Sequence, residues 1–196
     1  SWVIEGEKLA REGKVKEAVA TFKKAAKWNS DLNLNSNFQV WAKSLAEAET
    51  LMEEGTKLAK EEKIEAAVEK YQRAKKLDQV AFIPTWQNLD PEAKARYQAV
   101  DALLNKGLTL VTVGKVKEAI ASYQKAEKID PTQISASYWN KLCRYGSLYQ
   151  KAADVMFACE KAVALSPDEE YIIDSRGLAR ALTGDIEGAI ADFQVY

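Results

Sequence analysis

The chain has 196 residues, with 28 Lys and Arg against 29 Asp and Glu and no His. The charges are interspersed and almost balanced, which argues against a nucleic-acid-binding or membrane-surface protein. Without His the chain lacks the commonest general base and the commonest transition-metal ligand, so we expect no enzyme, no cofactor and no metal site. No apolar stretch has the roughly 18 residues of a membrane-spanning helix, and we expect a cytoplasmic protein.

The first predicted element is a helical hairpin over about residues 1–30, turned at the hexapeptide GKVKEA. Gly6 lies twelve residues before Ala18, and apolar residues near both recur every three or four positions. This spacing keeps them on one face of each helix. Gly13 can take the left-handed conformation that ends the first helix.

The same pattern recurs along the chain. Each unit has a small or apolar anchor followed twelve positions later by a second one, as in Gly6/Ala18, Gly55/Ala67, Gly107/Ala119, Cys143/Val155 and Gly177/Ala189. Gly114 and Gly184 repeat the turn at Gly13. Such self-similarity predicts a helical repeat protein, with units at about 1–30, 37–78, 90–132, 134–168 and 169–196.

The first two gaps between anchors are longer than the others and predict insertions at about 30–47 and 79–99. A continuous apolar stripe predicts a single long helix from about residue 37 to 61. Ser36 and Gln39 form a predicted capping box at its start.

A second long helix is predicted to begin at Pro91, with Asp90 as its N-cap. We expect the two long helices to pack on each other as a flap over one end of the array. The alternative is that the aromatic residues of this region only close a core. The aromatic residues in question are Phe38, Trp41, Trp86 and Tyr97.

The repeated pattern resembles the tetratricopeptide repeat, with the best matches at Leu103 to Pro131 and Trp2 to Ala25. The resemblance implies an all-α fold, a right-handed alpha-alpha superhelix that forms one solenoid domain over residues 1–196 with two extended helices. The last two units also resemble modules of bacterial, cyanobacterial-type multidomain proteins that carry protease or nucleoside-triphosphatase domains. We therefore expect the chain to be a fragment of a larger protein.

The resemblance also implies a non-catalytic protein–protein interaction module that binds a peptide, a helix or a neighbouring domain in a concave groove. Regulation of an effector domain in the same polypeptide, or self-association, are the alternatives. Positions beside the core stripe of each first helix are the predicted groove contacts. These are Met52, Thr56, Leu104, Asn105, Leu108, Asn140, Lys141, Arg144, Asp174 and Ser175.

Two of these residues suit a peptide ligand by their chemistry. An Asn such as Asn140 can both donate to and accept from an extended main chain, and Arg144 can bind a carboxylate in bidentate fashion. Some tetratricopeptide modules clamp the acidic C-terminus of chaperones with Lys and Asn. We do not expect that clamp, because the corresponding positions hold Val3, Glu7, Glu53, Asp101 and Asn105.

The last two units differ from the repeated pattern at two pairs of residues, a pair of cysteines and a pair of arginines. Cys143 and Cys159 fall at core positions of one hairpin, where we expect buried free thiols, although their positions also allow them to pair. Arg176 and Arg180 fall on an apolar stripe and need partners if they are buried. We expect a structural ion-pair network with Asp174, Asp192 or Glu160, rather than a ligand site.

Overall fold

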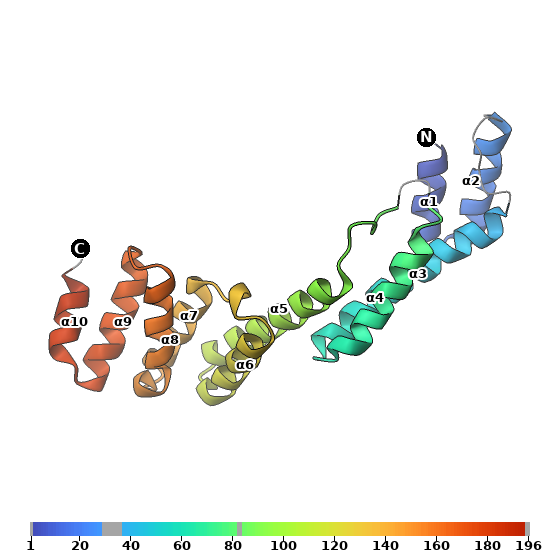
Figure 1. Cartoon of the computed structure of the whole chain (residues 1–196). Helices are drawn as coiled ribbons and strands as arrows, with labels where there is room; N and C mark the ends of the chain where they lie inside the picture. Colours follow the sequence, from blue (N-terminus) through green and yellow to red (C-terminus); the bar gives the residue numbers. More distant parts are fainter. Residues whose placement is uncertain (1, 29–36, 82–83, 195–196) are drawn as a thin grey trace. The chain divides into compact units, whose positions relative to one another are not determined.

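The computed structural model describes residues 2–28, 37–81 and 84–194 (Figure 1). The chain divides into two compact units, Ser1–Gln98 and Ala99–Tyr196. The regular elements of the described residues are all helical, which confirms the predicted all-α class. They are α1 (Trp2–Arg11), α2 (Val15–Trp28), α3 (Phe38–Lys60), α4 (Ile64–Asp78), α5 (Pro91–Thr112), α6 (Val116–Ile129), the short 3-10 helix η1 (Pro131–Gln133), α7 (Ala136–Leu148), α8 (Ala152–Leu165), α9 (Glu170–Thr183) and α10 (Ile186–Phe193).

The helices pack as hairpins of consecutive elements, as the repeat predicts: α1 with α2, α3 with α4, α7 with α8 and α9 with α10. None of the helices described is long and apolar enough to cross a membrane. The prediction that residues 1–196 form a single solenoid domain remains a prediction.

The predicted N-cap is confirmed for α5, whereas α3 has a different N-cap from the predicted one. Asp90 caps α5 as expected, because its Oδ1 accepts hydrogen bonds from the backbone N–H of Glu92 at 3.0 Å and of Ala93 at 3.1 Å. At α3 the cap is Asn37, whose side chain accepts from the Val40 N–H at 3.1 Å. Ser36, the predicted capping residue, lies outside the described residues.

A close contact between a glycine and an aromatic ring recurs in four of the hairpins. In each, a Cβ atom on the glycine would lie well inside van der Waals distance of the ring, so only Gly lets the two helices approach this closely. The distances from that Cβ position are 2.5 Å for Gly6 to Phe22, 2.7 Å for Gly55 to Tyr71, 2.6 Å for Gly107 to Tyr123 and 2.7 Å for Gly177 to Phe193.

The hairpin of α7 and α8 replaces this contact with a disulfide bond between Cys143 and Cys159, sixteen positions apart. The glycine and the aromatic residue of the other hairpins have the same separation. The expectation of free thiols is therefore wrong. It relied on a reducing compartment, whereas the repeat itself places the two side chains face to face in the core, with 0% and 1% of each residue exposed.

The turns inside the hairpins confirm the left-handed glycines. Gly13, Gly114 and Gly184 have φ angles of 77°, 80° and 90°. The other two hairpins make the same turn without glycine, since Glu62 and Gln150 have φ angles of 63° and 60°. A left-handed conformation at a non-glycine residue costs on the order of 1 kcal/mol, so packing elsewhere in these hairpins must offset it.

The prediction of an aromatic flap is wrong for Phe38 and Trp41, which close a core at the start of α3. Trp86 does pack with both long helices, in one cluster with Met52 of α3 and Ala95 of α5. The Trp41 ring stacks on Phe22 of α2 with 4.1 Å between centroids, and Phe38 packs against the same ring at 6.1 Å. Tyr97 is 56% exposed. The extra turns of α3 thus extend the core of the first hairpin.

The predicted ion-pair network between α9 and its neighbours is confirmed. Arg176 Nε donates to Asp192 Oδ2 at 2.9 Å, and Arg180 Nη1 donates to both Asp192 oxygens at 3.0 Å. Glu160 of α8 accepts from both arginines. The hydrogen bond with Asp192 raises the pKa of the Arg176 guanidinium. Asp174 lies outside this network and pairs with Arg144 at 2.9 Å.

Candidate functional site

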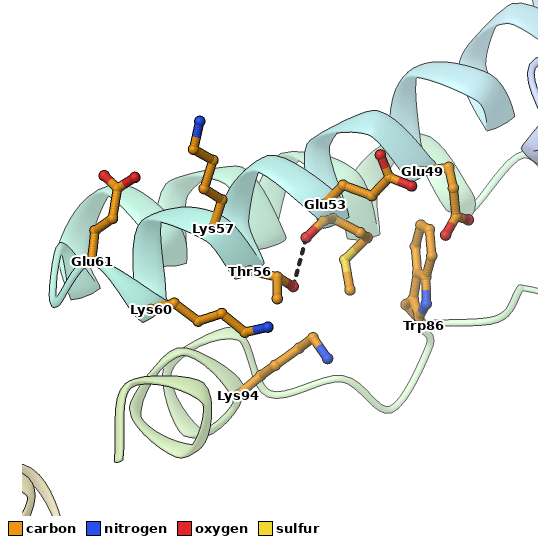
Figure 2. Close-up of a pocket in the computed structure, with 9 residues that line it drawn as sticks. Glu49, Glu53, Thr56, Lys57, Lys60, Glu61, Trp86 and Lys94 are labelled. Atoms are coloured by element: carbon orange, nitrogen blue, oxygen red, sulfur yellow. Dashed lines mark hydrogen bonds between the residues drawn. The ribbon is translucent and has the colours of Figure 1, made fainter. Parts of the chain in front are cut away.

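A groove of about 740 Å³ lies on the first unit between α3 and the segment that leads into α5 (Figure 2). Residues of α3 form one wall, and Trp86 and Lys94 form the other. The lining residues are Glu49, Met52, Glu53, Thr56, Lys57, Lys60, Glu61, Trp86 and Lys94.

The wall on α3 follows from the helical period. Glu49, Met52, Thr56 and Lys60 are three or four positions apart, which keeps them on one side of the helix. Glu53 and Lys57 follow directly after two of them and border the same side. Thr56 lies at the centre, where its hydroxyl is 3.0 Å from the hydroxyl of Tyr71 on α4. Tyr71 is the aromatic residue that packs on Gly55, so the repeat contact also supports the floor of the groove.

The opposite wall is held by a buried carboxylate. Asp78, the last residue of α4, is 0% exposed and accepts a hydrogen bond from the Trp86 backbone N–H at 2.7 Å. Asp78 also accepts from the guanidinium of Arg11, which lies 5.0 Å from the centroid of the Trp86 ring. Because Arg11 belongs to α1, this cluster ties the segment between α4 and α5 to the first hairpin as well as to α4.

The charges in the groove are separated along its length. In Figure 2, Glu49 and Glu53 lie at the end near Trp86, whereas the ammonium groups of Lys60 and Lys94 lie together beyond Thr56. Lys57 and Glu61 point away from this space. Lys94 Nζ is 5.6 Å from the centroid of the Tyr71 ring. The groove therefore has an acidic end and a basic end, and its apolar surface is the half-buried Trp86 with the small exposed part of Met52.

Glu49 is the carboxylate most affected by its surroundings. Burial raises the pKa of its carboxyl group, and the Arg11 guanidinium opposes this effect. The separation between Arg11 Nη1 and Glu49 Oε2 is 3.9 Å, at the limit for an ion pair. Arg11 Nη1 is buried and finds no hydrogen-bond partner in the described part of the chain. A cationic group at this end of the groove would therefore meet a carboxylate that is incompletely neutralised.

A second hollow, of about 600 Å³, shares Glu49 and Glu53 with the first and extends to the inner side of α1. It adds further carboxylates to the acidic end, those of Glu7 and Glu12, beside Ile4, Lys8, Arg11 and Thr85. The two hollows thus meet at the glutamates of α3.

The structure brings two of the predicted contacts, Met52 and Thr56, into the groove. The other eight lie in the second unit. Leu104 and Ser175 are almost fully covered, at 2% and 0% exposed, and offer little surface to a partner. Asn105 is exposed and Leu108 is half-buried.

The polar residues predicted on α7 and α9 have contrasting surroundings. Asn140 is buried, and its Oδ1 has no hydrogen-bond partner among the described residues. Lys141 Nζ lies 5.5 Å from the Tyr138 ring centroid. Arg144 pairs with Asp174, so two predicted contacts already bind each other. Whether these residues meet a partner remains a prediction.

Sequence reasoning missed Glu49, Lys60, Trp86 and Lys94. Glu49 and Lys60 continue the spacing of Met52 and Thr56 in both directions, so the helical period could have found them. Trp86 is held in the groove by the buried Asp78 cluster, and Lys94 lies on α5 with its ammonium group near the Tyr71 ring of α4. No local sequence pattern reveals either contact. Among the described residues there is no group of three or more His, Cys, Asp or Glu placed to hold a metal ion.

The fold and this groove define an all-α helical-repeat protein with a ligand-sized depression beside α3 in its first unit. Residues 100–133 match the family model of the tetratricopeptide repeat. The chain therefore contains a tetratricopeptide repeat, and its other hairpins repeat the same packing of two helices. No curated protein sequence matches the chain.

Several solved structures are similar in outline. MamA AMB-1 is 15% identical over 99% of this chain and 87% of its own, with a TM-score of 0.45. MamA MSR-1 is 15% identical over 99% of this chain and 91% of its own, with a TM-score of 0.43. The TPR domain of P58(IPK) is 17% identical over 99% of this chain and 49% of that chain, also with a TM-score of 0.43.

Proposed function

We propose that the chain is a non-catalytic interaction module that binds a segment of a partner protein in the groove between α3 and Trp86. Tetratricopeptide repeats are in general protein–protein interaction modules. The observation that carries the proposal is the groove itself, whose apolar centre is flanked by side chains that can hydrogen-bond or ion-pair. A concave surface with a few polar groups is the usual form of a binding site.

Contacts within the first unit support this function. They position both walls of the groove without a ligand, one through the packing of Tyr71 on Gly55 and the other through the hydrogen bond from Trp86 N–H to Asp78. A preformed site loses less conformational freedom on binding, which favours affinity. The partner is a peptide segment of another protein or of a neighbouring domain in the same polypeptide.

Filling the groove should abolish peptide binding. We expect Thr56→Arg to reduce affinity at least tenfold, because the longer side chain occupies the centre of the groove. The measurement selects binders from a random twelve-residue peptide display library on the immobilised chain, then determines their affinities by fluorescence anisotropy.

The matched control for this experiment is Thr50→Arg, the same substitution on the exposed side of the same helix. Thermal unfolding followed by circular dichroism checks that both variants fold. Failure to select any peptide, or equal affinity for a folded Thr56→Arg variant and the control, would contradict the proposed function.

Self-association is a second candidate, and α10 favours it. Ile186 and Ile190 are 56% and 50% exposed, and Phe193 beside them is 43% exposed. Their spacing of four and three places them on one face of the helix. Sedimentation velocity should then show a mass that rises with concentration, and Ile190→Glu should remove the rise. Leu148→Glu, which alters an exposed apolar residue of α7, should leave it unchanged; a constant monomer mass for the unaltered chain would rule this candidate out.

A further inference from the structure

The two ends of the groove carry opposite charges that the described residues do not neutralise. Glu53 and Lys60 are both exposed and line the groove, and neither has an ion-pair partner within the described ranges. Glu49 has only the contact of 3.9 Å to Arg11. By contrast, Glu54 on the outer side of α3 pairs with Lys70 at 2.6 Å. Unpaired charges of both signs therefore face the groove, the acidic ones toward Trp86 and the basic ones beyond Thr56.

The distance between the two ends sets the size of a complementary ligand. Glu49 and Lys60 are eleven positions apart on one helix, which corresponds to about 16 Å at 1.5 Å per residue. An extended peptide advances about 3.4 Å per residue and covers this distance in about five residues. A helix would need eleven residues for the same span.

The polar lining of the groove favours the extended form. An extended chain leaves its own backbone N–H and C=O groups free to bond polar side chains along the walls, such as those of Thr56 and Lys60. A helix pairs these groups internally.

From these observations we infer that the groove selects an extended peptide segment with one acidic and one basic residue about five positions apart and apolar residues between them. The acidic residue binds Lys60 and Lys94, and the basic residue binds Glu49 and Glu53. The apolar residues cover Met52 and the Trp86 ring. This inference rests on the proposed function and adds the spacing of the ligand's charges to it. The order of the two charges along the peptide follows from the direction of its main chain, because main-chain hydrogen bonds to the walls favour one direction.

Four synthetic hexapeptides test the inference on the full chain. Three have the same composition, and the fourth replaces the charged residues with their neutral counterparts. Two carry the charges five positions apart in opposite orders, acetyl-DALALK-amide and acetyl-KALALD-amide. A third, acetyl-DKALAL-amide, has adjacent charges, and a fourth, acetyl-NALALQ-amide, is neutral. Isothermal titration calorimetry at low salt should show that one of the two spaced orders binds about fivefold more tightly than the other three peptides. The difference should shrink as salt screens the charges.

Exchanging the groove charges supplies the decisive comparison. The variant Glu53→Lys with Lys60→Glu should lose the preference between the two spaced orders, because each end of the groove then carries both signs. The control variant Lys117→Glu with Glu118→Lys makes the same exchange on exposed positions of α6 and should keep the preference.

The outcomes separate this inference from the function on which it rests. If the four peptides bind with equal affinity, if none saturates the chain at millimolar concentration, or if the exchanged variant keeps the preference, the inference is wrong. Peptides selected from the display library that are blocked by Thr56→Arg but show no charge order would leave the interaction module standing without this specificity. No peptide binding in either experiment would overturn both.

Discussion

Replacing Asp192 with Ala should lower the free energy of unfolding of the second unit by about 3 kcal/mol. Asp192 is only 4% exposed and accepts hydrogen bonds from both Arg176 and Arg180. Removing it leaves two largely buried guanidinium groups with only Glu160, whose side chain is 49% exposed, and Asp185, 3.6 Å from Arg180, to balance them. Urea denaturation followed by circular dichroism measures the change.

The matched control is Asp174→Ala, which removes the exposed pair between Arg144 and Asp174. Exposed ion pairs contribute less than about 1 kcal/mol, so this variant should unfold almost like the unaltered chain. Equal losses for both aspartates would show that burial of the arginines does not determine the strength of the network.

Removing the disulfide bond by Cys143→Ala with Cys159→Ala should also lower the free energy of unfolding by about 3 kcal/mol. The bond closes a loop of sixteen positions, and without it the unfolded chain regains the freedom of that loop. The alanines also leave space in the core between α7 and α8. Reduction of the unaltered chain with dithiothreitol should produce a loss of similar size, measured by denaturation with and without the reductant.

A third variant tests whether the disulfide takes the place of the repeat contact. Cys143→Gly with Cys159→Phe installs the pair found at Gly6 and Phe22, and should recover part of the stability that the double alanine variant loses. Its unfolding should no longer respond to dithiothreitol. A variant less stable than the double alanine one would show that this hairpin cannot accommodate the glycine–aromatic contact of the others.

The parts of the fold that the sequence predicted are those set by spacing within one hairpin. The anchors and the glycine turns depend on residues at most sixteen positions apart, so the helical period is enough to place them. The ion pairs of Arg176 followed from a simple rule, that a charge on an apolar stripe requires a partner. The disulfide was equally local, and an assumption about the redox compartment outweighed its position in the repeat.

Apart from the disulfide, the predictions that failed involved contacts between hairpins. Phe38 and Trp41 could have met any neighbouring apolar surface, and periodicity does not say which one. They pack on Phe22 of the preceding hairpin. In the same way, the wall of the groove depends on Arg11, Asp78 and Trp86, which come from three separate segments. These three residues come into contact only when their segments pack together in the folded first unit.

The residues that line the groove and those that hold the hairpins together are largely different. Trp86 belongs to the segment between α4 and α5, and Lys60 and Glu53 lie on the open side of α3, whereas the glycine–aromatic contacts lie inside the hairpins. Substitutions at Glu53 and Lys60 therefore need not disturb the packing of the hairpins. Under the proposed function, the choice of ligand can then change while the repeat contacts stay the same.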